Sequence, residues 1–333
     1  MNPQEIITKF SERKLPEGRT ITDFTLKDHV MEHSQFSKAM TMIAEVHQLR
    51  RVKGYGAGFV LMAESGFGKS VILQQYQSYF PRCSVNLKSV IPVVFITLPS
   101  RPTDLSMATA VLDAMGHPLA SKKENAAEKT KKIYELFNTC KVELILIDEL
   151  HHLDKSHNSV EYYVALNWLK NLISLGNASV VTAGLPRTKS IIQGNKELKR
   201  RFIKELTLTP FEWTDKFSFV EFRSILKKFG ELLPFECETP LQEQNLARRI
   251  LIASHGLLDY VRQLLDGAVY IAQFMHKPII NLEVLATAFR EYIWSDVPEK
   301  LNPFNPKATL RKLDKFGEPF HLSEKYWKGG KNE

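Results

Sequence analysis

The chain has few cysteines, and their spacing suits neither a metal site nor a disulfide framework. The three cysteines, Cys83, Cys140 and Cys237, lie far apart, and no CxxC pair occurs. This argues against a zinc ribbon and against a small fold stabilised by disulfides. Free thiols in a reducing compartment are therefore expected.

Long hydrophobic runs are also missing. Apolar runs such as IPVVFI and VELILI are far shorter than the ~20 residues that a membrane-spanning helix needs. The first residues, MNPQEIITKFSERK, lack the apolar stretch of a secretory signal. The sequence therefore predicts a cytoplasmic protein without a membrane-spanning segment.

Acidic residues are outnumbered by basic ones, 37 to 45, which gives the chain of 333 residues a formal net charge of +8. An excess of this size is typical of proteins with a polyanionic partner, such as nucleic acid or a membrane surface. A basic soluble protein without such a partner has the same composition, so the charge alone leaves both interpretations open.

Short apolar strands alternate with helical stretches as far as about Phe211. The expected strands are FVLMA, PVVFITL, VELILID and ASVVTAG, and only helical patterns follow them. Nearly continuous apolar strands separated by helices indicate an α/β fold, with a parallel sheet covered on both faces. We therefore predict an N-terminal arm (1–34), an α/β domain (35–212), a small helical domain (213–302) and a C-terminal tail (303–333).

A glycine-rich loop follows the first strand and precedes a helix. Residues 63–70 read AESGFGKS, which matches the P-loop pattern G-x-x-x-x-G-K-[ST] except that Ala63 replaces the first glycine. In such loops the backbone N–H groups surround phosphates, the lysine reaches the β- and γ-phosphates, and the hydroxyl binds Mg²⁺. ATP and Mg²⁺ are therefore the expected cofactors. The expected nucleotide-binding residues are Ser65, Gly66, Phe67, Gly68, Lys69, Ser70 and Val71.

An acidic pair ends the strand VELILID. Because ligands bind at the carboxyl edge of a parallel sheet, we expect Asp148 and Glu149 to lie beside the phosphate loop. Asp148 would hold Mg²⁺ together with Ser70, and Glu149 would be the catalytic base that polarises water, with Lys69 as a second catalytic group.

Histidines follow the acidic pair directly. The segment HHLDKSH places His151, His152, Asp154 and His157 close together, but it does not fit the zinc motif H-E-x-x-H. We therefore interpret these histidines as polar residues at the catalytic edge, and keep a transition-metal site as the weaker alternative.

Four segments occur in the order seen in AAA+ ATPases: AESGFGKS, LILIDELHHL, SVVTAGLP and NKELKRRF. The sequences of these segments resemble the TniB/TnsC family of transposition regulators, and are similar to those of the TnsC proteins of CRISPR-associated, Tn-seven-type transposons. The resemblance covers roughly residues 35–300. It implies an AAA+ P-loop NTPase fold, in which the α/β domain binds nucleotide and the helical domain is a lid.

The resemblance also implies a function and a set of partners. Family members are ATPases that form a ring or filament on double-stranded DNA. They connect a target-selection protein of the TniQ type, and in some systems an RNA-guided complex, to the transposase. The expected partners of this chain are therefore duplex DNA, further copies of itself, a transposase and the target-selection proteins.

Further site residues follow from the resemblance alone. The RRF segment implies an arginine finger, Arg201 with Arg200 as its neighbour, which would reach the γ-phosphate bound by an adjoining subunit. The family often has a Gly-Thr pair where this chain has Gly184 and Leu185, so Thr182 becomes the candidate sensor hydroxyl. Related ATPases have a second sensor arginine at the position where this chain has Asp259. The nearest arginine is Arg262.

The DNA contacts are expected in two segments that resemble the family's pore-facing region. They are SRPTD, which contains Arg101 and Thr103, and the basic stretch with Lys122 and Lys123. A solvated charged surface is the alternative interpretation of both. Three other functions remain open: a replication initiator or helicase loader, a nucleotide-switched scaffold without DNA binding, and, less favoured, a metabolic kinase.

Overall fold

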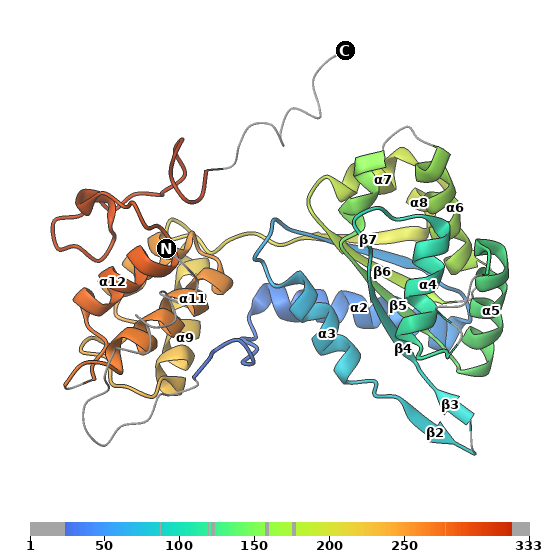
Figure 1. The fold of residues 1–333 in the computed structure, drawn as a ribbon, viewed down its shortest axis with the longest axis horizontal. Helices are drawn as coiled ribbons and strands as arrows, with labels where there is room; N and C mark the ends of the chain where they lie inside the picture. The colour runs from blue at the N-terminus through green and yellow to red at the C-terminus, as the bar shows by residue number, and fades with distance from the viewer. Residues whose placement is uncertain are drawn as a thin grey trace, which may run out of the picture. The chain divides into compact units, whose positions relative to one another are not determined.

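The computed structural model describes residues 24–86, 88–118, 120, 124–156, 160–174, 178–276 and 278–321. The chain forms two compact units, one of residues 32–209 and one built from the described parts of 1–31 and 210–333 (Figure 1). Among these described residues, no helix has the length and apolar character that crossing a membrane requires.

The first unit is built on a parallel sheet of five strands. Their spatial order is β4 (Val93–Thr97), β5 (Leu144–Asp148), β6 (Ser179–Gly184), β1 (Gly58–Met62) and β7 (Phe202–Thr207). Every residue of β1, β5 and β6 is buried, which explains their continuous apolar sequences. The predicted α/β fold is therefore confirmed.

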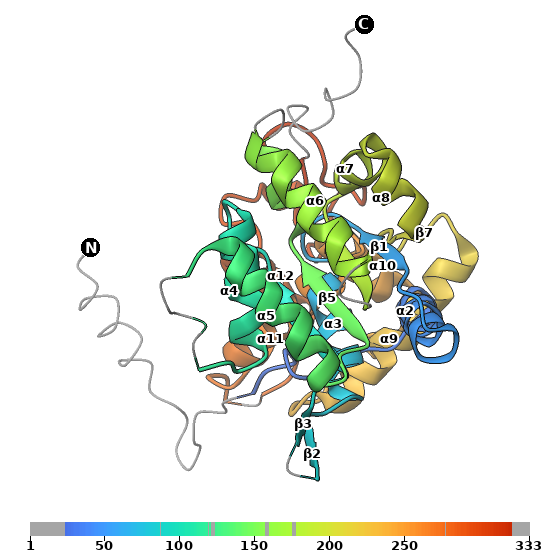
Figure 2. The same cartoon turned by 90° about the vertical axis from the view of Figure 1, so that its right-hand side faces the viewer.

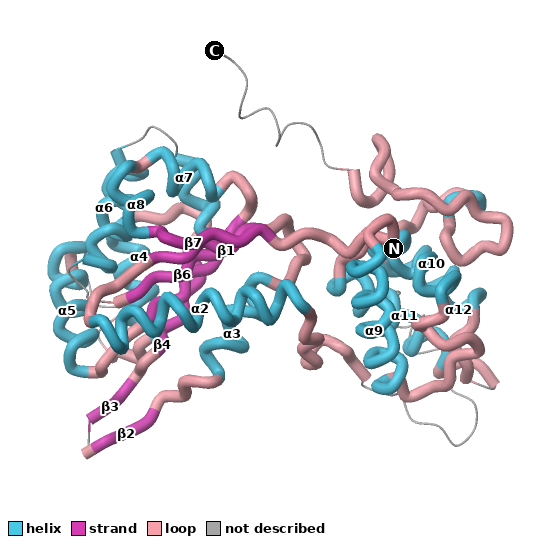
Figure 3. Tube along the Cα trace, turned by 180° about the vertical axis from the view of Figure 1, so that it is seen from behind, coloured by secondary structure: helices cyan, strands magenta, loops and turns pink. Residues whose placement is uncertain are grey.

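Helices cover both faces of this sheet. Figures 2 and 3 show α2 (Ser34–Lys53) and α3 (Lys69–Ser78) on one face, and α4 (Asp104–Ala114), α5 (Ala126–Thr139) and α6 (Val160–Ser174) on the other. The 3₁₀ helix η1 (Leu150–Ser156) follows β5, and α7 (Thr188–Gly194) and α8 (Lys196–Arg201) lie between β6 and β7.

Two features of this unit are not predicted by the sequence pattern. Strand β7 is a sheet edge whose burial alternates, with Phe202 buried and Ile203 and Glu205 exposed, so it shows no continuous apolar run. A short antiparallel hairpin, β2 (Cys83–Val85) with β3 (Lys88–Val90), precedes β4 and extends away from the sheet (Figure 1). Its described residues are exposed or half-exposed.

The second unit is helical. It contains α9 (Lys216–Leu232), α10 (Gln244–Ser254), α11 (Leu258–Ala272), α12 (Leu282–Tyr292) and the short η2 (Glu299–Leu301). Each of the four α-helices buries one apolar face in a common core, which includes Phe222, Ile250, Leu264 and Phe289.

Segments that precede and follow these helices in the sequence complete this core. Leu26 and Met31 are buried in it, and the backbone N–H of Leu26 donates to Asp266 Oδ1 at 2.9 Å. Phe304, Leu313 and Phe320 are buried in the same core. The sequence pattern predicts an arm and a tail for these stretches, because their apolar residues are too sparse to show a period.

Candidate functional site

The glycine loop between β1 and α3 has the backbone that phosphate binding needs. Gly66 and Gly68 have left-handed φ angles of 82° and 74°, and the space where a Cβ would lie on Gly68 is open to 4 Å. Ala63 does not have a positive φ, and its N–H donates to Gly184 O at 3.1 Å. The missing first glycine therefore causes no backbone strain.

Lys69 begins α3 and turns its side chain into the loop. Its ammonium donates to the carbonyl oxygens of Ala63 at 2.9 Å and Glu64 at 2.7 Å, and the residue is 7% exposed. Burial lowers the pKa of Lys69, while the nearby carboxylates of Asp148, Glu149 and Glu64 raise it. The lysine is thus held at the helix N-terminus, where anions are stabilised.

Ser70 and Asp148 meet as the sequence predicts. The Ser70 hydroxyl donates to Asp148 Oδ2, and Asp148 Oδ1 accepts the backbone N–H of Glu149 at 2.8 Å. Asp148 is 2% exposed. A hydroxyl and a carboxylate side by side are oxygen ligands of the kind that Mg²⁺ prefers, so these two residues fit that ion.

Glu149 lies at the same edge in an unusual conformation. Its φ of 62° is left-handed, which is uncommon for a residue with a side chain. One carboxylate oxygen, Oε2, is 3.1 Å from His151 Nε2 and 3.7 Å from His152 Nε2. The Nδ1 atom of His152 lies 3.0 Å from the carbonyl oxygen of Leu98, the residue after β4.

These contacts give the two histidines a place in the site. The sequence suggested polar histidines at the catalytic edge, but not their contacts with Glu149 or Leu98. The donor atoms of Glu149, His151 and His152 lie within 4.8 Å of one another, so they could also hold a metal ion. The side chain of Asp154 and the whole of His157 lie outside the described residues.

The hydroxyls beside β6 lie in a buried environment. Thr182 is fully buried, and its register partners are Val60 on β1 and Ile147 on β5. The hydroxyls of Thr182 and Thr188 have no hydrogen-bond partner among the described residues. A Cβ on Gly184 would lie 2.3 Å from Thr188 Oγ1, so a larger residue there would require Thr188 to move.

The predicted finger Arg201 is the last residue of α8. Leu198 anchors this helix in the core, Asn195 caps it, and an ion pair of 2.7 Å joins Glu197 to Lys170 on α6. Arg201 makes no hydrogen bond or ion pair with the described residues of the P-loop or with the acidic pair. A role toward the nucleotide of another subunit stays a prediction.

The other predicted residues are on other elements of the chain or outside the described residues. Arg262 is on α11 in the helical unit, where its guanidinium donates to His29 O at 2.9 Å and burial lowers its pKa. Arg101 is exposed between β4 and α4, and Thr103 is the N-cap of α4, where its hydroxyl accepts the N–H of Ser106 at 3.1 Å. Lys122 and Lys123 lie outside the described residues.

The strand order, the P-loop after β1 and the acidic end of β5 define the fold of AAA+ P-loop proteins. A family model described as bacterial TniB protein matches residues 22–213, more than half of the chain, so the chain belongs to the TniB family. No curated protein sequence matches the chain significantly.

Several solved structures share the fold at low sequence identity. The ORC2 protein of Aeropyrum pernix with ADPNP and ADP has a TM-score of 0.62 at 13% identity, over 82% of this chain and 72% of that one. The ORC1 protein of Aeropyrum pernix in complex with DNA has a TM-score of 0.59 at 18% identity, over 80% and 68%. Cdc6p of Pyrobaculum aerophilum has a TM-score of 0.56 at 10% identity, over 84% and 73%.

Proposed function

We propose that this protein is an ATP-dependent, DNA-binding regulator of transposition that hydrolyses ATP and assembles on duplex DNA. The observation that carries the ATPase part is the hydrogen bond between Ser70 and Asp148 beside the buried Lys69. It joins the P-loop to the acidic strand end, as a site for a magnesium–nucleotide complex requires. Membership of the TniB family supports the role in transposition.

The P-loop would bind ATP through its phosphates. The backbone N–H groups in the first turn of α3, which have no partner within a helix, would donate to phosphate oxygens. The Lys69 ammonium, which now donates to the carbonyl oxygen of Ala63, would turn to the β- and γ-phosphate oxygens. Ser70 and Asp148 would hold Mg²⁺, which supplies positive charge to those phosphates.

Glu149 would be the general base of hydrolysis. Water attacks the γ-phosphorus, the bond to the β,γ-bridging oxygen breaks, and Glu149 accepts the proton that the water loses. Its partly exposed carboxylate, at 33%, lies at the carboxyl edge of the sheet next to Asp148. Arg201 would act on the γ-phosphate of a neighbouring subunit, so that ATP links the subunits of a ring or filament.

Duplex DNA would be held through its phosphates. Arg101 is exposed immediately before α4, and the N-terminus of that helix is a second positive feature. The net charge of +8 and the DNA complex of the similar ORC1 protein support this part.

The proposal also includes protein partners: a transposase, a TniQ-type protein and an RNA-guided complex. It further includes a close relation to the TnsC proteins of CRISPR-associated transposons.

A replication initiator is the second candidate function. The similarity to ORC and Cdc6 structures favours it, but identities of 10–18% carry only the fold, whereas the TniB model matches the sequence itself. An initiator would prefer particular duplex sequences. A transposition regulator that reads phosphates would bind duplexes of any sequence with similar affinity.

The test is fluorescence anisotropy of labelled duplexes over a salt series, with a non-hydrolysable ATP analogue or with ADP. We expect tighter binding with the analogue, little sequence preference and a steep negative salt slope. Arg101→Glu should weaken binding to every duplex and reduce the salt slope by about one, with Lys131→Glu on the exposed face of α5 as the matched control. ATP hydrolysis without any DNA binding would instead favour the nucleotide-switched scaffold.

A further inference from the structure

The turn after β5 brings three metal-binding side chains to one point. The N–H of His152 donates to Glu149 O at 2.9 Å, and Glu149 has a left-handed φ of 62°. As a result, Glu149 Oε2 lies 3.1 Å from His151 Nε2 and 3.7 Å from His152 Nε2. Consecutive residues of a regular α-helix do not face each other, so this convergence depends on the tight turn.

These donor atoms suit a zinc ion in kind and in spacing. Two histidine nitrogens with one glutamate oxygen are the protein ligands of one class of zinc site, in which the fourth position stays open. Zinc–ligand bonds of about 2.0–2.2 Å in tetrahedral geometry place two ligand atoms roughly 3.4 Å apart. The contacts of 3.1 and 3.7 Å lie on either side of that value, and all three donor atoms lie within 4.8 Å of one another. Small rotations of the side chains would therefore complete the site.

His152 is also oriented as a zinc ligand. A carbonyl oxygen only accepts, so His152 Nδ1 carries a hydrogen and donates to Leu98 O at 3.0 Å. In the neutral ring, Nε2 then has a lone pair, which faces the carboxylate oxygen of Glu149. This arrangement is attractive only when a proton or a metal ion lies between the two atoms. Histidines that bind metal ions usually donate their other ring N–H to a carboxylate or a backbone carbonyl, as His152 does.

The cluster differs from the adjacent magnesium site in its donor atoms. Ser70 and Asp148 offer oxygen atoms alone, which Mg²⁺ prefers, whereas imidazole nitrogen favours zinc and related transition metals. The side chains of His151, His152 and Glu149 are 11%, 19% and 33% exposed, so an ion can enter from solvent. The sheet edge therefore presents two neighbouring sites with different metal preferences.

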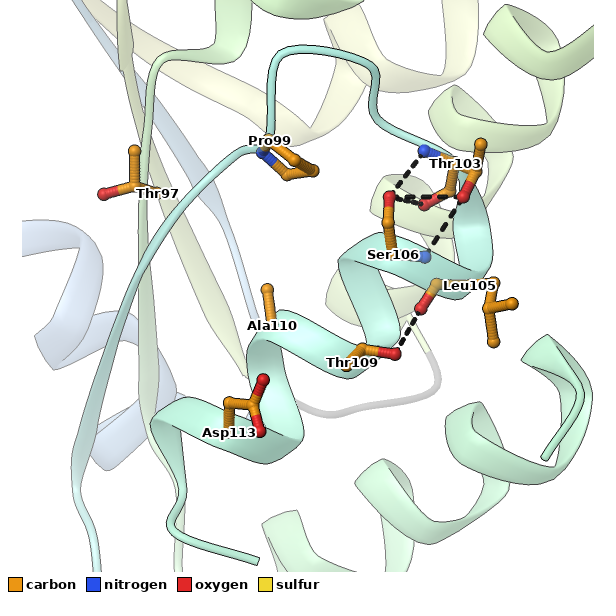
Figure 4. A pocket seen from close by; sticks show the side chains of 8 residues that line it. All are labelled: Thr97, Pro99, Thr103, Leu105, Ser106, Thr109, Ala110 and Asp113. Atoms are coloured by element: carbon orange, nitrogen blue, oxygen red, sulfur yellow. Dashed lines mark hydrogen bonds between the residues drawn. The ribbon is translucent and has the colours of Figure 1, made fainter. Parts of the chain in front are cut away.

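The cavity beside Leu98 does not compete for the same ion. Thr97 and Pro99 line one side of this open space, and residues of α4 line the other (Figure 4). Its volume is about 460 Å³. Its polar side chains are threonine and serine hydroxyls and the carboxylate of Asp113, and none of its lining residues is a histidine or a cysteine. Zinc at this strand end is therefore expected at the histidines.

We propose that Glu149, His151 and His152 form a zinc site that inhibits ATP hydrolysis. Zinc bonds to both Nε2 atoms and to Glu149 Oε2, a water molecule occupies the fourth position, and any hydrogen on the three protein atoms leaves to solvent. The carboxylate then shares its electron pair with the metal ion, which prevents it from accepting the proton of the attacking water. The inhibition rests on the proposed function, whereas the binding of zinc does not.

The inhibited protein keeps its nucleotide. Neither the P-loop nor the pair of Ser70 and Asp148 contributes a ligand to zinc, so ATP and Mg²⁺ bind as before. In the proposed assembly ATP links neighbouring subunits. Zinc should therefore lengthen the lifetime of the assembled state as well as slow turnover.

The first experiment measures zinc binding without nucleotide. Metal-free protein competes with a chromophoric zinc chelator in magnesium-free buffer, and we expect one zinc ion per chain. His152→Asn keeps an amide N–H near the Nδ1 position, and with it the bond to Leu98, but removes the ligand nitrogen. This variant and His151→Asn should bind zinc at least about 10- to 100-fold more weakly, the loss that follows removal of a supporting residue alone. His29→Asn, at an exposed histidine of the helical unit, is the matched control.

Two precautions make the binding result specific. All proteins carry Cys83→Ser, because an exposed thiol is itself a zinc ligand. Thermal melts report whether each variant keeps its fold, and Co²⁺ added in place of zinc reports the ligand set through its visible absorption. A tetrahedral cobalt spectrum that the asparagine variants lack would support the site even if one variant were less stable.

The second experiment measures steady-state ATP hydrolysis at saturating Mg²⁺, with and without added zinc. We expect zinc to lower kcat by about 10²- to 10⁴-fold, the contribution of a general base, with little change in the KM for ATP. A chelator should restore the rate. His151→Asn and His152→Asn should lose most of the inhibition, because each lacks one zinc ligand.

The outcomes separate the zinc site from the function beneath it. Equal zinc affinity in the wild type, the asparagine variants and the control would overturn the site and leave a proton between His152 and Glu149. Inhibition that persists in both variants and is relieved by excess Mg²⁺ would place zinc at Ser70 and Asp148. A rise in kcat would mean that zinc-bound water attacks ATP, and either of these two results would overturn the inhibition. Absence of ATP hydrolysis in the zinc-free wild type would overturn the proposed function, while the zinc titration without nucleotide would still decide the site.

Discussion

Thr182→Val distinguishes a sensing hydroxyl from one that is merely buried. Thr182 is fully buried between Val60 and Ile147 in the sheet, and its hydroxyl has no hydrogen-bond partner among the described residues. A buried polar group without a partner destabilises a protein by about 1–3 kcal/mol. Valine has nearly the same shape and removes that group, so the free energy of unfolding should rise by up to this amount.

The increase is large enough to measure by calorimetry. In a unit of this size each kcal/mol shifts Tm by about 2–4 °C, so the nucleotide-free variant should melt about 2–12 °C higher. If the hydroxyl senses the γ-phosphate, kcat for ATP should fall in the same variant, and stability and activity would change in opposite directions.

Two controls make the result specific. Thr188→Val removes a second buried hydroxyl without a partner among the described residues, and it should stabilise without the same loss of kcat. Thr182→Ala also removes a methyl group, so a small cavity should cancel part of the gain. A valine variant less stable than the wild type would refute the reasoning about burial, and an unchanged kcat would remove Thr182 from the catalytic residues.

Four further predictions concern the nucleotide, the neighbouring subunit and pH. Lys69→Ala should abolish ATP binding, because it removes the cation that faces the phosphates; normal affinity in a nucleotide titration would contradict the P-loop assignment. Glu149→Gln should bind ATP and Mg²⁺ but hydrolyse slowly, since the amide is no base, and a wild-type turnover rate would rule Glu149 out. Arg201→Ala should bind nucleotide yet lose oligomerisation and about 10³–10⁵ in rate, and mixing it with Lys69→Ala should restore some turnover; no rescue at any ratio would place Arg201 outside the neighbour's site. His47, buried between Tyr76 and Glu143, has a pKa that burial lowers from its ordinary 6.5. The unfolded chain therefore binds more protons below about pH 6.5, and the free energy of unfolding should fall as the pH drops from there toward the folded-state pKa. Urea titrations of the wild type and His47→Gln at pH 7.5 and 5.5 should show a smaller loss in the variant, and equal losses would exclude His47 as a source.

The fold could be predicted where one physical signal dominates. Strands β1, β4, β5 and β6 are apolar because the sheet is covered on both faces, and the predicted runs include all four. The hairpin β2–β3 and the edge strand β7 are not predicted, because exposed strands need no apolar run. The sequence does not predict that Leu26 and Met31 are buried in a core, because a few apolar residues in a polar segment show no period.

Some features of the candidate site can likewise be predicted from the sequence, and others cannot. The meeting of Ser70 with Asp148 follows from a motif and from the rule that strand ends share one edge. The contacts of His152 with Leu98 and Glu149 depend on side-chain directions at a left-handed residue, which sequence spacing does not reveal. The place of Arg201 in a neighbour's site depends on a second subunit and stays a prediction.

The helical unit is assembled from stretches of chain that a ribosome makes at different times. Leu26 and its partner Asp266 are 240 residues apart in the sequence. At about 5–20 residues per second, synthesis of that interval takes roughly 10–50 s. Residues 32–209 are continuous and emerge within the interval, so the α/β unit can fold first. The apolar residues around Leu26 and Met31 meanwhile lack their packing partners, and a chaperone that binds short apolar stretches would have its longest access to the nascent chain there.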